Sequence, residues 1–193
     1  MALDDLYMLV ANQQWLVAIN HIQSLADGDA VDQIFFQNLL GIAAIMMACY
    51  HSAPLELYQV MITKAKLDQG KRCLLAIAHC RGDAVLRYAA WFHPDPAVFE
   101  LLISEHPLGL QTVGSSCHTP QQTATVHRNT APMISLLTDT ADVLAAGYFA
   151  ALAARVHGDE RTLRRLALSP DRLTVRVTLL LCVEHGYVNI RRS

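Results

Sequence analysis

Nine histidines and five cysteines are the side chains of this chain best suited to metal binding or nucleophilic chemistry. No two of them form an H-x3–5-H or C-x2–4-C pair, the spacings typical of zinc sites. His79-Cys80 and Cys117-His118 are neighbours in sequence, and neighbouring side chains on a helix or strand point apart. The spacing therefore predicts no metal site and no cofactor.

Cys117-His118 also suggests a thiol nucleophile beside its general base. Sequence neighbours rarely reach the required geometry, and no third group that would orient the base is evident. Val113-Gly114-Ser115-Ser116 lacks the G-K-[ST] ending of a phosphate-binding loop, so we expect a flexible loop there. We expect neither an enzyme nor a small-molecule substrate, and a small helical enzyme stays as an alternative.

Arg161, Arg164 and Arg165 fall on one side of an expected helix near the end of the sequence. Such a basic patch can bind nucleic acid or an acidic partner. The cluster is small, the net charge of the chain is −2, and no aromatic residues interleave with the arginines. We therefore expect a solvated or subunit-facing patch, with nucleic acid as the alternative.

The composition is unusually apolar, with 53% hydrophobic and 17% charged residues, whereas charged residues make up about a quarter of a typical soluble domain. Such a chain either buries much of its surface or presents an apolar face to a partner. The continuous apolar run, 39–50, is shorter than the roughly twenty residues that a membrane-spanning helix needs. We therefore expect a buried helix and no transmembrane segment.

The odd number of cysteines and the acidic start of the sequence bear on the compartment. Five cysteines cannot all pair, so reduced thiols in an intracellular protein are the simplest interpretation. An acidic beginning is unlike a signal or transit peptide, which is basic. We expect a cytoplasmic protein by default, and a plastid or mitochondrial protein after presequence removal as the alternative.

Helical periodicity dominates the chain and recurs as pairs of short helices. Three segments align without a gap when Gly41, Gly82 and Cys117 are placed at the same point. Each segment has an alanine seven residues later, a bulky apolar residue nine after that, and an apolar pair three further on. These positions are Ala48, Ala89 and Ala124; Leu57, Val98 and Met133; and Val60-Met61, Leu101-Leu102 and Leu136-Leu137.

This pattern resembles the ankyrin repeat, a tight turn followed by two helices, whose first helix opens with T-P-L-H-x-A. Thr119-Pro120 and Ala124 match that signature, as do Leu86 and Ala89 in the preceding repeat. The signature histidine is replaced, by Met46 and Arg87 for example. The amino-acid sequence of the later repeats is similar to that of ankyrin-like proteins of unicellular algae and their relatives.

The resemblance implies an all-α, ankyrin-like solenoid of stacked antiparallel helix pairs. Because most Asp-Gly turn tips are missing, we expect irregular connecting loops. We expect a single elongated domain over residues 1–193. It comprises an N-terminal capping helix pair (1–37), three ankyrin-like units (38–144) and C-terminal capping helices (145–193).

The resemblance also singles out a concave face, formed beside each opening glycine and at the end of each first helix. The corresponding positions are Leu39, Leu40, Ile42, Tyr50 and His51; Cys80, Arg81, Asp83, Trp91 and Phe92; and Ser115, Ser116, His118, Val126 and His127. Exposed aromatic residues suit partner binding, so we expect Tyr50, Trp91 and Phe92 to form a ridge. The alternative is that Trp91 and Phe92 pack into the core.

These observations predict a non-catalytic protein–protein interaction scaffold or adaptor. A structural accessory subunit of a large organellar or membrane-associated complex is the second hypothesis, favoured by the low charge. In both cases the expected partner is another protein or protein complex.

Overall fold

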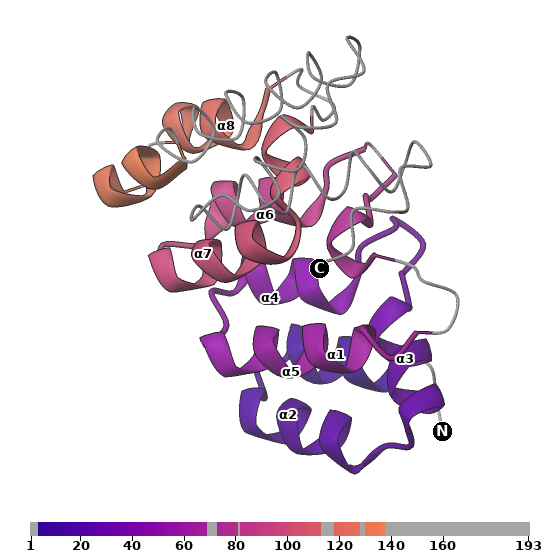
Figure 1. Ribbon diagram of the computed structural model, residues 1–193. Helices are drawn as coiled ribbons and strands as arrows, with labels where there is room; N and C mark the ends of the chain where they lie inside the picture. Colours follow the sequence, from indigo (N-terminus) through magenta and orange to yellow (C-terminus); the bar gives the residue numbers. More distant parts are fainter. Residues whose placement is uncertain (1–3, 69–72, 81, 113–117, 128–129, 138–193) are drawn as a thin grey trace, which may run out of the picture. The chain divides into compact units, whose positions relative to one another are not determined.

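The computed structural model describes most of the N-terminal two thirds of the chain (Figure 1). The described residues are 4–68, 73–80, 82–112, 118–127 and 130–137. The chain divides into two units, Met1–Ser135 and Leu136–Ser193, and the fold below is that of the first. The predicted C-terminal capping helices (145–193) lie outside the described residues, as do Arg161, Arg164 and Arg165.

Every regular element in the described residues of the first unit is a helix, which confirms the all-α prediction. The α-helices are α1 (Asp5–Ala11), α2 (Trp15–Ser24), α3 (Asp27–Phe35), α4 (Ala44–Tyr50), α5 (Leu55–Ala65), α6 (Val85–Phe92), α7 (Pro96–Glu105) and α8 (Pro120–Val126). Two 3-10 helices, η1 (Leu74–Ala76) and η2 (Pro107–Gln111), lie between them. Residues 131–137 are helical as well.

The helices pack in two series. In the first series, α1 contacts α4, α4 contacts α6, and α6 contacts α8; in the second, α2 contacts α5 and α5 contacts α7. In sequence, α1, α4 and α6 are each followed by a member of the second series, and α1–α2, α4–α5 and α6–α7 also pack as pairs. Figure 1 shows α1, α4 and α6 following one another through this unit.

The three aligned alanines occupy matching environments. Ala48, Ala89 and Ala124 are fully buried in α4, α6 and α8, and the residue before each of these helices has the same extended backbone. The bulky residues nine positions later, Leu57 and Val98 among them, are fully buried too. A small side chain at the alanine position lets the neighbouring helices of the first series approach closely.

Two loops have the same closed form. Gln37 and Ala43 form one antiparallel bridge, and Ala78 and Ala84 form the other. In each loop a glycine donates its N–H to the carbonyl three residues earlier at 2.8 Å, Gly41 to Asn38 and Gly82 to His79. We call residues 37–43 the first finger and residues 78–84 the second finger. The prediction of irregular connecting loops is wrong here, because main-chain hydrogen bonds close both fingers.

The first finger lies directly against the second. The Cys80 N–H donates to the Leu40 carbonyl at 3.0 Å, and Gln37 Nε2 donates to the Ala78 carbonyl at 3.2 Å. Gly41 has a φ of +75°, and a Cβ added to it would lie 3.0 Å from the Cys80 nitrogen. Glycine is therefore required at position 41 both for its backbone conformation and for the close approach of the fingers.

The N-terminal part contains one helix more than predicted. The expected pair is present as α1 and α2, but α2 ends at Ser24 and Gly28 lies in the first turn of α3. Gly28 therefore lies inside a helix, although a glycine after an apolar helical run often marks a helix end. Asp27 and Asp29 flank it in that first turn, where acidic side chains are favoured, and Ala30, Val31 and Ile34 bury the inner face of α3.

Candidate functional site

A groove of about 310 Å³ lies where the two fingers meet α6. Its lining residues come from the first finger, the second finger and the outer side of α6: Leu40, Ile42, His79, Cys80, Asp83, Tyr88, Trp91 and Phe92. Six of these eight were predicted for the concave face, and His79 and Tyr88 were not. Tyr88 lies one helical turn before Trp91 and Phe92, a spacing that could have revealed it.

A row of aromatic rings borders the groove. The ring of Tyr50 meets that of Phe92 edge-on, with centroids 4.8 Å apart. The ring of Trp91 lies 4.5 Å from that of His127 and stacks on Phe92 at 5.1 Å. The Tyr50–Phe92 and Trp91–His127 contacts each join neighbouring repeats. In both, a residue nine positions after the first aligned residue of one repeat meets a residue ten positions after the first aligned residue of the next repeat. We call Tyr50, Phe92, Trp91 and His127 the aromatic row.

The exposure of the aromatic row shows whether Trp91 and Phe92 lie at the surface or in the core. Trp91 is 38% exposed and Tyr50 is 51% exposed, while Phe92 is half-buried. The buried side of α6 is formed instead by Val85, Leu86, Ala89 and Ala90. Trp91 therefore lies at the surface and not in the core.

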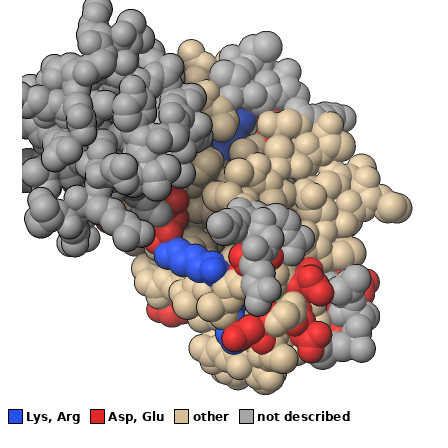
Figure 2. Space-filling view, turned by 45° about the vertical axis from the view of Figure 1, so that its right-hand side comes forward, with Lys and Arg blue, Asp and Glu red and all other residues tan. Residues whose placement is uncertain are grey.

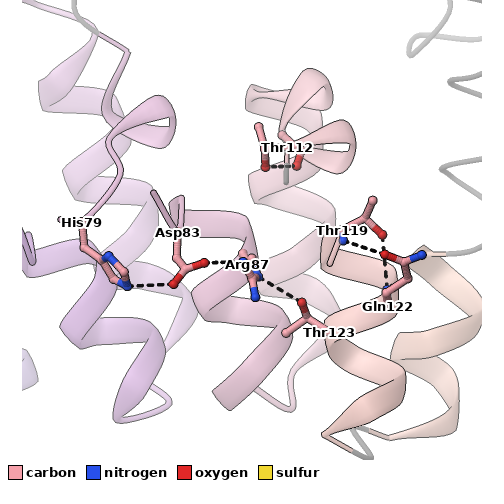
Figure 3. A network of polar contacts seen from close by, with 8 residues as sticks. His79, Asp83, Arg87, Thr112, Thr119, Gln122 and Thr123 are labelled. Atoms are coloured by element: carbon pink, nitrogen blue, oxygen red, sulfur yellow. Dashed lines mark hydrogen bonds and ion pairs between the residues drawn. The ribbon is translucent and has the colours of Figure 1, made fainter. Parts of the chain in front are cut away.

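A mostly buried chain of polar contacts runs from the second finger through α6 to α8 (Figure 3). His79 Nε2 lies 2.8 Å from Asp83 Oδ2, and the other carboxylate oxygen of Asp83 accepts a hydrogen bond from Arg87. Arg87 Nε in turn donates to Thr123 Oγ1 of α8 at 3.1 Å. We call His79, Asp83, Arg87 and Thr123 the polar chain; it ties the second finger to α6 and α6 to α8.

The polar chain requires one correction to the predicted binding residues. Asp83 is only 2% exposed, and its carboxylate interacts with Arg87 and His79. It supports the wall of the groove and is not free to pair with a charge on a partner. The spacing of four residues between Asp83 and Arg87, typical of helical ion pairs, was a signal for this contact.

The other predicted binding residues fall into three groups. The exposed ones are Leu39, Leu40, Tyr50, Cys80, Trp91, Val126 and His127, and the half-buried ones are Ile42, His51, Phe92 and His118. Arg81, Ser115 and Ser116 lie outside the described residues. The structure thus brings Tyr50, Phe92, Trp91 and His127 together in the aromatic row, and places His51 edge-on against Tyr50 at 4.9 Å.

Charged side chains are unevenly spread over the surface. Figure 2 shows a group of acidic side chains at one end of the described surface and a broad tan area without charge. The acidic residues of α3, Asp27 and Asp29, lie in its first turn, and Asp27 pairs with Lys64 at 2.7 Å. Among the described residues that line the groove, Asp83 is the only aspartate, glutamate, lysine or arginine, and its ion pair with Arg87 is buried.

Two further features of the described residues concern metal binding and membrane spans. No group of three or more histidine, cysteine, aspartate or glutamate side chains converges there in a way that would hold a metal ion. Within the same residues, no helix has the length and apolar character needed to cross a membrane.

Comparison of the chain with protein-family models, with curated proteins and with solved structures gives no match. The candidate site therefore rests on the geometry described above.

Proposed function

We propose that this chain is an ankyrin-like repeat protein that binds another protein through the groove and the aromatic row, and that it is not an enzyme. Three features support the repeat assignment: the matching fingers, the matching burial of the aligned alanines, and the two series of packed helices. Helix pairs that bury their apolar sides only against their neighbours are the physical basis of such stacks. We propose an intracellular setting for the protein.

The observation that carries the binding proposal is the exposed aromatic row beside the groove. Tyr50 and Trp91 present large ring surfaces to solvent, and other residues form the buried side of α6. Rigid aromatic side chains gain binding free energy with little loss of conformational freedom, and they dominate many protein–protein interfaces. Because the described residues that line the groove are mostly apolar and aromatic and the Asp83 carboxylate is paired with Arg87, the contact surface of the partner should be apolar.

The decisive experiment compares two variants, each with a single substitution to alanine. Trp91→Ala removes the centre of the aromatic row, whereas Leu16→Ala removes an equally apolar side chain that is 71% exposed on α2, away from the groove. Tagged full-length proteins are used to capture partners, which are identified by mass spectrometry. Proteins bound by the parent should be lost with Trp91→Ala, at a cost of about 2 kcal/mol or more in affinity, and retained with Leu16→Ala.

Folding is the necessary control for this comparison. Both variants should keep the helical circular dichroism and the melting temperature of the parent, because neither side chain is part of the core. Partner binding that persists with Trp91→Ala would contradict the proposed binding face. A loss of folding in that variant would instead assign Trp91 to the core.

A structural accessory subunit is the second candidate, and the exposed surface of α2 favours it. Leu16 and Val17 are both exposed there, and Val17 is 52% exposed. An adaptor with one binding face does not need a second apolar patch, whereas a subunit inside a larger complex does. Loss of partners with Leu16→Ala, and not with Trp91→Ala, would favour this alternative.

A further inference from the structure

Cys73 and His106 form a thiol–imidazole pair away from the groove. Cys73 directly precedes η1, and His106 directly follows α7. Cys73 Sγ lies 3.9 Å from His106 Nδ1, and the thiol is exposed. A thiol within reach of an imidazole nitrogen is the arrangement in which a cysteine loses its proton readily.

The position of His106 is fixed by the chain around it. Its N–H donates to the Leu102 carbonyl at 2.9 Å, and its carbonyl accepts from the Gly109 N–H at 3.0 Å. The ring also packs against Gly109, since a Cβ added there would lie 3.1 Å from Cδ2 of His106. The imidazole is thus held by the junction between α7 and η2 while it faces the thiol.

The surroundings of Cys73 favour its thiolate form. The hydrogen bond with His106 lowers the pKa of the Cys73 thiol, and the backbone N–H groups of Ala76 and Leu75 add to this effect. Partial burial opposes it and is outweighed. The thiolate is the reactive form of cysteine.

Two other described cysteines provide an internal comparison. Cys49 is fully buried in α4, and burial raises the pKa of its thiol to about 12. Cys80 is exposed, and no histidine forms a hydrogen bond with its thiol among the described residues. Cys73 alone of the three combines exposure with an imidazole partner.

We propose that Cys73 is a modification site at which small-molecule disulfides, such as oxidised glutathione, form a mixed disulfide with the protein. In this reaction His106 Nδ1 takes the thiol proton, and Cys73 Sγ attacks one sulfur of the disulfide. The original S–S bond breaks as the new one forms. The leaving thiolate takes up the proton from His106, so Cys73 is oxidised while half of the disulfide is reduced.

The test is the rate of modification at each cysteine of the folded, full-length protein. The protein is incubated with oxidised glutathione at pH 7, and peptide mapping by mass spectrometry scores every cysteine separately, including Cys117 and Cys182. Cys73 should react at least about threefold faster than Cys80, because a larger thiolate fraction raises the rate more than the accompanying loss of nucleophilicity lowers it. Cys49 should stay unmodified.

His106→Gln separates the role of the imidazole from simple exposure. It should slow the modification of Cys73 to about the rate of Cys80, and it should raise the pH midpoint of Cys73 alkylation by iodoacetamide. The rate at Cys80 should not change, and Cys49 should stay unmodified, which reports that the fold is intact. Equal rates at Cys73 and Cys80 in the parent protein, or a Cys73 pH midpoint no lower than that of Cys80, would overturn the proposal even if the variant fails to fold.

Discussion

At the scale of single residues, the buried pair of Asp83 and Arg87 is the most exacting feature of the candidate site. Both side chains are almost fully buried, so each depends on the other to offset its loss of hydration. The positions 41 residues earlier are occupied by Ile42 and Met46, which are apolar. At these matching positions, one repeat therefore has a pair of charged side chains and the preceding repeat has a pair of apolar side chains.

This substitution between repeats gives a sharp prediction. Arg87→Met alone leaves the Asp83 carboxylate buried with one partner fewer and should lower the free energy of unfolding by about 3–5 kcal/mol. The double variant Asp83→Ile/Arg87→Met copies the preceding repeat and should recover most of that loss. Urea unfolding followed by circular dichroism measures both. A double variant as unstable as Arg87→Met would mean that the pair itself is not the source of the effect.

At the scale of elements, the helices that pack most regularly were the ones that the sequence predicted best. The alanines of α4, α6 and α8 and the bulky residues of α5 and α7 follow one register, and each is buried as expected. α3 was missed because a glycine in a first helical turn looks the same in sequence as a glycine that ends a helix. The closed fingers were missed because their hydrogen bonds are made by the main chain, which leaves little signal in residue types.

Cys73 and His106 lie beyond what spacing can reveal. They are 33 residues apart, and only the folding of the chain brings the imidazole of His106 to the thiol. The burial of Asp83 likewise depends on where the second finger lies relative to α6. The sequence predicted most of the groove lining because those residues occur at fixed distances from each opening glycine.

The two finger glycines make a matched pair for testing the contact between fingers. Gly82 has a φ of +81° with open space around its missing Cβ, whereas Gly41 also meets the backbone of His79 and Cys80. Gly82→Ala should therefore lower the free energy of unfolding by about 1–2 kcal/mol, the cost of a left-handed conformation. Gly41→Ala should lower the free energy of unfolding by roughly 1–3 kcal/mol more than Gly82→Ala does, because its added methyl group overpacks the contact between the fingers.

Chemical denaturation of the two glycine variants measures this difference directly. Hydrogen exchange at the Cys80 amide is a second readout, because that amide donates to Leu40 across the fingers. It should exchange faster in Gly41→Ala than in Gly82→Ala. Equal destabilisation by the two substitutions would show that the fingers do not depend on their close approach.

At the scale of the described fold, His93 links one helix pair to the next. Its Nε2 lies 3.1 Å from the Ala53 carbonyl in the turn between α4 and α5, and its Nδ1 accepts from the Asp95 N–H. A carbonyl can only accept and an N–H can only donate, so these partners assign the neutral ring with its proton on Nε2. The Tyr58 ring packs edge-on against it at 5.6 Å.

The neutral state of His93 makes the stability of this fold depend on pH. Burial lowers the pKa of His93, against smaller opposing effects of the Ala53 hydrogen bond and the Asp95 charge. The unfolded chain, with a histidine pKa near 6.5, then binds a proton more readily than the folded one. The contribution of His93 to stability is full above that pH and is lost as the pH falls through about 6.5 toward the lower folded value.

His93→Gln isolates this contribution, since an amide does not titrate. The variant should be less stable than the parent at pH 7.5, because the ring contacts are lost, and the difference should shrink as the pH falls to 5. Urea unfolding of both proteins across this range measures the difference, in which the other histidines and the carboxylates cancel. A constant or widening gap at low pH would mean that His93 is not held neutral between the repeats.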